Sequence, residues 1–161
     1  MKYIAWALVI VVVLVGAVMG YAYAGAHLQY EGVRVEVMPA QEQRTLYDTT
    51  RNAISLDSFT GVQFQKSDLL MPESYQWMTY TVRLSNKGVL PAEWLRIEVR
   101  PDASDVLQLG EERGFTLAAG GKGDLRGTML TRVGAKQARM LHITYYVMGR
   151  AYSLDIDMGA V

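Results

Sequence analysis

Histidine, serine and aspartate residues near the C-terminus have the types and spacing of a hydrolase triad. His142 lies in an alternating segment, and Ser153 and Asp155 lie in the next one, after a short turn. Pairing in a hairpin would bring them together, and a histidine between a hydroxyl and a carboxylate activates the hydroxyl as a nucleophile. No nucleophile elbow or oxyanion loop accompanies these residues. We therefore expect His142 to be an ordinary strand residue and the protein not to be an enzyme.

Carboxylates form three small groups: Asp102 with Asp105, Glu111 with Glu112, and Asp155 with Asp157. The last pair shares one strand face, but no loop offers the several further oxygens that calcium needs. Cysteine is absent, which excludes disulfides, Cys-zinc sites and cysteine nucleophiles. The glycine-rich stretch 120–123 lacks the Gly-Lys-Ser/Thr of a phosphate loop. We expect solvated carboxylates, a turn at 120–123, no metal and no cofactor.

Tyrosine and tryptophan are the side chains best suited to bind a partner on the surface of a sheet. The chain has 10 Tyr and 3 Trp against 3 Phe, which favours a β-rich domain with half-buried aromatic faces. Tyr75, Trp77 and Trp94 fall on or near one pair of expected strands, and they form a candidate binding surface for a protein or glycan. The alternative is that the segment 41–74 covers this face, and the pattern leaves both possibilities open.

The overall charge argues against a nucleic-acid partner. The 16 basic and 16 acidic residues cancel, and no run of like charge occurs. Outside the apolar N-terminal stretch about 130 residues remain, which is the size of one domain that can build its own core. We therefore expect one folded domain whose partners are not selected by net charge.

The apolar stretch Tyr3–Ala26 carries no charge. As a helix it would be about 36 Å long, against roughly 30 Å of membrane hydrocarbon. Tyr3 and Trp6 lie near one end and Tyr21 and Tyr23 near the other, as in the two aromatic belts of a membrane helix. These features predict that the chain is attached to a membrane through this stretch.

The predicted organisation is an N-terminal signal-anchor helix over residues 1–28 and an extracytoplasmic domain over 29–161. Lys2 and the short N-terminal tail favour an N-terminus in the cytoplasm of a single-pass protein of the cell membrane. Small residues around Ala24 also fit a signal-peptidase site, so a secreted soluble domain cleaved near Ala24 is the alternative. The long apolar run favours the uncleaved anchor.

Small residues recur at Gly16, Gly20 and Ala24, on one face of the expected membrane helix. A small-xxx-small face lets two membrane helices approach closely. Small residues are also common in membrane helices without any such role. The face is therefore a candidate helix–helix interface, through which the protein would join a larger membrane complex as an accessory subunit.

The rest of the chain alternates between apolar and polar residues, as half-buried strands do. The alternating segments are 30–38, 75–85, 94–100, 105–109, 124–132, 138–148 and 151–158. Gly149-Arg150 reads as a two-residue hairpin loop with glycine first. Between 39 and 74 the pattern is weak, and 45–52 fits a short helix or a strand equally well. No segment after the membrane stretch is a convincing helix.

Seven or eight short strands with regularly spaced turns predict an all-β fold, an antiparallel β-sandwich. The run Tyr80–Val99, with Asn86-Lys87-Gly88 before Trp94, resembles the second and third strands of bacterial extracellular immunoglobulin-like modules of the conserved-adhesin type. Leu117-Ala118-Ala119-Gly120 stands where such domains often carry a Leu-x-Pro-Gly turn, although the Pro is missing here. The resemblance covers residues 75–158. It implies an immunoglobulin-like sandwich and a role in surface display, adhesion or assembly.

The expected function is a membrane-anchored β-sandwich that acts, without catalysis, as a binding, assembly or structural module at the cell surface. A protein partner fits this expectation. The accessory-subunit and secreted-domain alternatives keep the same fold and differ only in what the N-terminal stretch does. Oligomeric state and ligand are not readable from the residues.

Overall fold

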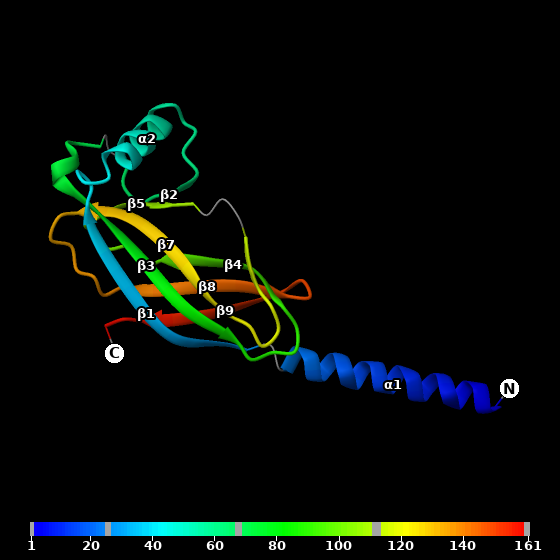
Figure 1. Cartoon of the computed structure of the whole chain (residues 1–161). Coiled ribbons are helices and arrows are strands. Elements are labelled where there is room, and N and C mark those ends of the chain that lie inside the picture. The colour runs from blue at the N-terminus through cyan, green and yellow to red at the C-terminus, as the bar shows by residue number, and fades with distance from the viewer. Residues whose placement is uncertain (1, 25–26, 67–68, 111–113, 160–161) are drawn as a thin grey trace.

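The structure is a computed structural model that describes residues 2–24, 27–66, 69–110 and 114–159. Its first element is the α-helix α1 (Lys2–Ala24), which projects away from the rest of the molecule (Figure 1). Residues 3–21 of α1 are long and apolar enough to cross a membrane, and none of this span is buried against protein. The predicted stretch extends to Ala26, but residues 25–26 lie outside the described part of the chain. The helix prediction is confirmed by its length, its apolar character and its complete exposure.

Two antiparallel sheets form the domain. The first sheet contains, in spatial order, β1 (Leu28–Pro39), β3 (Tyr75–Asn86), β7 (Lys122–Arg132), β5 (Asp105–Leu109) and β2 (Gly61–Gln63). The second sheet contains β6 (Phe115–Leu117), β4 (Ala92–Val99), β8 (Met140–Val147) and β9 (Arg150–Asp157). The predicted all-β sandwich is therefore confirmed. Without the short strands β2 and β6, the order β1-β3-β7-β5 facing β4-β8-β9 is that of an immunoglobulin constant-type sandwich.

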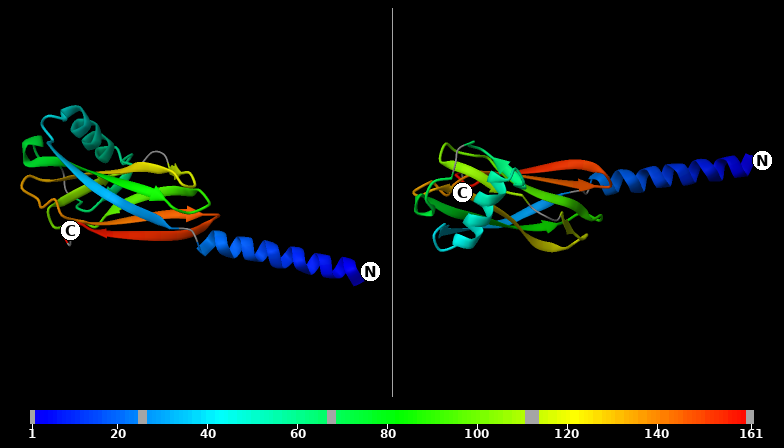
Figure 2. Two further views of the ribbon diagram at one scale, coloured as in Figure 1. Left: turned by 60° about the horizontal axis from the view of Figure 1, so that its bottom comes forward. Right: turned by 90° about the horizontal axis from the view of Figure 1, so that it is seen from above.

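The long axis of the sandwich gives it two ends, which both views in Figure 2 show. The near end adjoins α1 and carries the turns 87–91, 118–121 and 148–149. The far end carries a second helix, α2 (Arg44–Ser55), the 3₁₀ turn η1 (Pro72–Ser74) and the loops 100–104 and 133–139. The strand β1 joins α1 at the near end to α2 at the far end.

The inner core fills the space between the two sheets. It is built from the alternate residues that the sequence placed on one face of each strand, among them Met78, Tyr80, Val82, Leu84, Ile97, Leu141, Ile143, Tyr145 and Val147. The two sheets approach each other closely at Gly127, where a Cβ atom would lie 2.9 Å from Cγ2 of Ile97. Glycine is needed there because any side chain would push β7 away from β4.

A second hydrophobic core, which we call the outer core, lies on the opposite face of the first sheet beneath α2. Its buried members are Ala40, Tyr47, Leu69, Tyr75, Trp77, Val106, Leu107 and Leu130. Tyr47, Thr50 and Ile54 are spaced at i, i+3 and i+7, and this puts them on the face of α2 that turns to the sheet. The segment 45–52, for which the pattern left a short helix or a strand open, is therefore a helix, and the sequence did not make it convincing because a short helix with many polar residues is stabilised by the sheet it covers.

The hairpin between β8 and β9 differs by one residue from its prediction. Val147 pairs with Arg150, so the loop residues are Met148 and Gly149, not Gly149 and Arg150. Their φ angles are 48° and 77°, and a turn with positive φ at both central residues is of type I′. The sequence suggested a glycine-first loop, but the twist of the strands selects the turn in which glycine comes second.

Candidate functional site

His142 lies on the outer face of the second sheet, between two carboxylates. It is directly opposite Glu98 of β4 on one side and Asp155 of β9 on the other. Its Nδ1 atom is hydrogen-bonded to Oδ1 of Asp155, and the two side chains are 41% and 63% exposed. The predicted proximity of His142 and Asp155 is thus present, because the hairpin register pairs them directly.

The third member of the triad is not joined to this pair. Ser153 is exposed and pairs with Thr144, which follows His142 by two residues on the same face of β8. Asp157 accepts a hydrogen bond from the backbone N–H of Gly159 at 2.8 Å and pairs with Met140. Within the part of the chain that the structure describes, no group of three or more histidines and carboxylates is placed to hold a metal ion. The arrangement offers an acid–base pair open to solvent, next to a groove.

The groove has a volume of about 430 Å³ and runs along the open side of the sandwich, between β2, the edge of the first sheet, and the part of β4 that extends beyond its short neighbour β6. Its apolar lining comes from Val62, Phe64, Val99, Pro101 and Met140. Its polar lining comes from Glu98, Arg100, Gln108, His142 and Asp155. An apolar floor with a few charged groups at the rim is the usual composition of a ligand site.

Gln108 closes the floor of the groove by joining the two sheets. Its side chain leaves β5 of the first sheet and donates from Nε2 to the carbonyl of Ile97 at 2.7 Å. Its Oε1 accepts from the backbone N–H of Val99 at 2.9 Å. These are the bonds that a neighbouring strand would make to β4, so a side-chain amide takes the place of a peptide group at this free edge. The groove therefore has a rigid wall whose backbone groups are satisfied.

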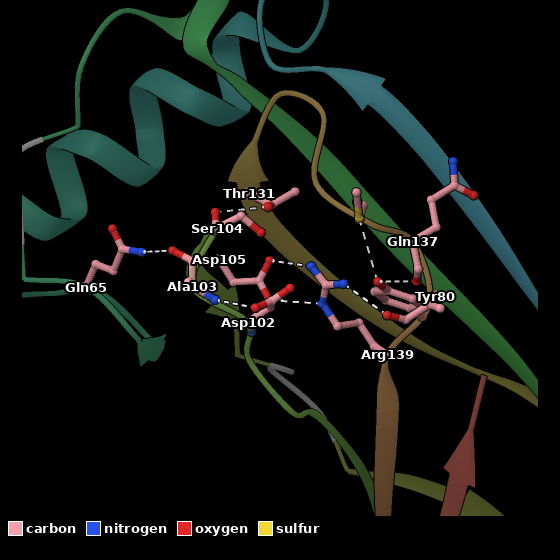
Figure 3. Close-up of polar contacts among 11 residues, drawn as sticks. Gln65, Tyr80, Asp102, Ala103, Ser104, Asp105, Thr131, Gln137 and Arg139 are labelled. Carbon is pink, nitrogen blue, oxygen red and sulfur yellow. Dashed lines mark hydrogen bonds and ion pairs between the residues drawn. The ribbon is translucent and has the colours of Figure 1, made fainter. Parts of the chain in front are cut away.

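A buried ion pair holds the far end of the sandwich together (Figure 3). The guanidinium of Arg139 donates to both carboxylate oxygens of Asp105, at 3.0 Å from Nε and 2.9 Å from Nη2. The two side chains are only 4% and 0% exposed. Asp105 also accepts from the backbone N–H of Asp102 at 2.7 Å, so the pair connects the loop 100–104 to the loop 133–139. Composition pointed to Asp102 and Asp105 as acidic neighbours but gave no signal for Arg139.

The charges of this cluster stabilise the connection between the two loops. The hydrogen bond to Asp105 raises the pKa of Arg139, so the guanidinium is charged at all accessible pH values. Burial raises the pKa of the neighbouring Tyr80 to about 12, and its hydroxyl donates to the carbonyl of Gln137 at 3.0 Å. Perturbed groups often mark reaction centres. Here the two groups are buried, and each is hydrogen-bonded to its own partners, Arg139 to Asp105 and Tyr80 to the carbonyl of Gln137, so the cluster has a structural role.

The three candidate aromatic residues separate into two environments. Tyr75 and Trp77 are 3% and 2% exposed, because α2 and the segment before η1 cover them in the outer core. They are therefore not surface residues, and the covered-face alternative describes them. Trp94 is 67% exposed and sits at a bulge of β4 with a φ of 54°, its ring against Gly114. Only Trp94 keeps its place on a candidate binding surface.

The small-residue face of α1 stays open. At Gly16 and at Gly20 a Cβ atom would meet nothing within 4 Å. Ala24 is the last residue of the helix. The helix–helix interface remains a prediction, since the face is free but no partner covers it.

Comparisons with known proteins leave the chain without an assigned family. No protein-family model matches it, and no curated protein matches its sequence. The likeness to bacterial cell-surface modules therefore stays a prediction, while the strand order and the site geometry describe the molecule itself.

Proposed function

We propose that the protein is a single-pass membrane protein whose β-sandwich acts outside the cytoplasm as a binding or assembly module, without catalysis. The observation that carries this proposal is α1. Its apolar side chains are exposed along the whole span 3–21, and no part of the described domain folds back to cover them. An apolar helix of this length is stable only in a lipid environment or against another membrane helix.

The groove supports the binding part of the proposal. It lies beside the end of β4 that extends beyond β6, and it combines an apolar lining with Arg100 and three groups that can accept a proton or a cation. His142 is hydrogen-bonded to a carboxylate, and no hydrogen bond joins it to Ser153 or Thr144 among the described residues, so its geometry suits recognition of a charged group better than hydrolysis.

Topology is tested with the full chain in intact cells. A protease added outside should remove the domain and leave α1 in the membrane fraction after alkaline extraction. Complete protection of the domain in cells with an accessible surface would overturn the outward orientation. The mass of the mature N-terminus decides the alternative: a chain that begins near Ala24 is the secreted form.

The absence of catalysis is tested with a hydrolase substrate panel and two matched variants of β8. His142→Ala and Thr144→Ala both alter half-buried side chains on the outer face. We expect no turnover by the parent or by either variant. Turnover that is lost in His142→Ala and retained in Thr144→Ala would overturn this claim and assign His142 a catalytic role.

An accessory-subunit role is favoured by one specific observation, the open face at Gly16 and Gly20. A partner recovered in mild detergent should be lost on Gly20→Leu, because the added side chain prevents close helix approach. Val18→Leu is the matched control on another face of α1, where an apolar residue already stands 67% exposed. Equal recovery of the partner with both variants would show that the small-residue face does not contact it.

A further inference from the structure

The near end of the sandwich has an unusual composition for a set of solvent-facing turns. The three segments that close it read KGVLP at 87–91, AAGGK at 118–122 and MGR at 148–150. Together they contain three cationic residues, Lys87, Lys122 and Arg150, and no acidic residue. The far-end segments carry acidic residues as well as basic ones, including Glu42, Asp57, Glu73 and Asp102. Glu31 of β1 pairs with Lys122 at 2.6 Å, so Lys87 and Arg150 are the cationic residues that these turns offer to a partner.

The tips of these turns expose apolar side chains. Val89 is 54% exposed and Met148 is 51% exposed. On the adjoining outer face of the second sheet, Trp94 and Tyr146 are 67% and 42% exposed. Apolar tips flanked by Trp, Tyr, Lys and Arg are the composition of protein surfaces that enter the headgroup region of a bilayer.

The chain itself places this end of the domain next to the end of α1. Only four peptide steps separate Ala24, at the end of α1, from Leu28, at the start of β1, so the two lie within about 14 Å of each other. The backbone N–H of Lys87 donates to the carbonyl of His27 at 3.2 Å, next to Leu28. The hydroxyl of Tyr145 is hydrogen-bonded to the backbone of Leu28. The turns are thus attached to the point where the chain leaves the helix (Figure 1).

Asn86 makes the near end a preformed surface. Its buried side chain donates from Nδ2 to the carbonyls of Leu90 at 2.8 Å and Leu117 at 3.1 Å, and its Oδ1 accepts from the N–H of Gly88 at 2.9 Å. One amide therefore ties the turn 87–91 to the turn that follows β6. Because the turns are held in place, Val89 is displayed toward the membrane without an additional ordering cost.

We propose that the near-end surface, formed by Lys87, Val89, Met148 and Arg150, docks onto the lipid headgroups of the leaflet that α1 leaves. The proposal rests on the proposed function, because it requires α1 to span the bilayer. Val89 and Met148 enter the interface, and the cationic residues contact lipid phosphates, which attract them most strongly when the lipid is anionic. The domain then stands with its groove and far end turned away from the membrane.

The absence of cysteine makes a direct test possible, since every introduced cysteine is unique. Full-length chains with a nitroxide label at Val89→Cys or Met148→Cys are reconstituted in phosphatidylcholine–phosphatidylglycerol vesicles. Val133→Cys and Leu56→Cys are the far-end controls, because these side chains are at least as exposed, at 60% and 76%. Leu14→Cys, in the middle of α1, reports on the helix. Collision with dissolved oxygen and with a water-soluble nickel chelate is measured for each label.

We expect the near-end labels to be several-fold less accessible to nickel than the far-end labels, with Leu14→Cys in the oxygen-rich bilayer centre. If Leu14→Cys reads as water-exposed, the proposed membrane anchor fails. If Leu14→Cys lies in the bilayer while Val89→Cys and Met148→Cys match the far-end controls, the anchor stands and the docking surface is overturned.

Two double variants test the contacts of Lys87 and Arg150 with lipid phosphates. Lys87→Glu with Arg150→Glu should lower the protection of the Val89→Cys label in anionic vesicles, while Arg132→Glu with Lys136→Glu, a pair toward the far end, should leave it unchanged. Equal protection in both double variants would overturn the lipid-phosphate contacts.

Discussion

The two faces of β3 show how much of a fold an alternating pattern determines. The inner face, Met78, Tyr80, Val82 and Leu84, is completely buried against the second sheet. The outer face changes character along its length: Tyr75 and Trp77 are buried beneath α2, whereas Arg83 near the other end is exposed. Alternation tells which side chains share a face. It does not tell whether the second face is covered, because the cover comes from a segment with little pattern of its own.

The two cores should also differ in how they fail. The inner core is shared by both sheets, so a loss there affects the whole sandwich. The outer core joins the first sheet to one helix and its flanking loops, and such satellite units often open independently of the whole domain.

Trp77→Ala should have the largest effect, a loss of about 4 kcal/mol in the free energy of unfolding, because it empties the centre of the outer core. Hydrogen exchange should show α2 opening while β4 and β8 stay protected. Trp77→Phe is the matched control. Its cost should be clearly smaller, because the buried Nε1 of Trp77 has no hydrogen-bond partner in the described part of the chain. Simultaneous exchange in α2 and β8 would contradict two separable cores.

Arg139→Met should cost about 3 kcal/mol, because it leaves the carboxylate of Asp105 buried without its partner. In contrast to the outer-core variant, the loss should appear as a global shift of the urea midpoint. The double variant Asp105→Leu with Arg139→Met should recover much of the stability, since both charges are then gone. A single Arg139→Met variant as stable as the parent would show that the ion pair does not stabilise the fold.

Gly127→Ala should cost about 2 kcal/mol by forcing β7 away from Ile97. Gly32→Ala on β1 is the control, because a Cβ atom there meets nothing within 4 Å and the change should be within about 0.5 kcal/mol. Thermal unfolding of the two variants measures the difference. Similar midpoints for both would show that the sheets can separate at β7 without loss.

Alkaline pH should weaken both cores alike. Burial raises the pKa of Tyr80 in the inner core and of Tyr47 in the outer core from 10 to about 12. Each folded pKa lies above the unfolded one, so the stabilisation of the neutral phenol is complete below pH 10 and is lost as the pH rises toward 12. At pH 11 each tyrosine should cost on the order of 1 kcal/mol relative to neutral pH. The fall of the free energy of unfolding between pH 10 and 12, measured by urea titrations, should be smaller in Tyr80→Phe and in Tyr47→Phe. An unchanged fall in either variant would show that its tyrosine does not contribute to the alkaline loss of stability.

His142→Gln should have the smallest effect on folding, within about 0.5 kcal/mol, because its pair with Asp155 is exposed to water. The urea midpoint at neutral pH is the measurement. A loss as large as that of Arg139→Met would mean that the outer face of the second sheet is a structural site and not a free rim of the groove.

The sequence predicts the strands and their inner faces because burial of one face imposes a period of two on each strand. The predicted strand Asp105–Leu109 has its observed bounds, and the inward residues of β3 and β8 are those expected. The helix α2 was predictable only as one of two alternatives at 45–52, because Thr and Asn are weak helix formers and the sheet beneath it supplies much of its stability.

The candidate site was predictable only in part, for a related reason. His142 and Asp155 belong to one hairpin, and local register brings them together. The groove requires Phe64, Gln108 and Met140, which come from three separate segments of the chain. The buried partner of Asp105 lies 34 residues away in a loop. Such pairings follow from the topology of the sandwich, which a single sequence does not display.

The connection of β1 to both helices has a mechanical consequence. Tension between the membrane and a partner held at α2 runs along the covalent backbone of β1, because α1 precedes this strand and α2 follows it. The strand is already extended, so its hydrogen bonds to β3, from Leu28 opposite Asn86 to Pro39 opposite Gln76, carry little of the load. Single-molecule pulling between α1 and α2 should therefore detach α2 from the outer core before it separates β1 from β3. A molecule with this geometry can hold a tether under strain while its groove stays intact.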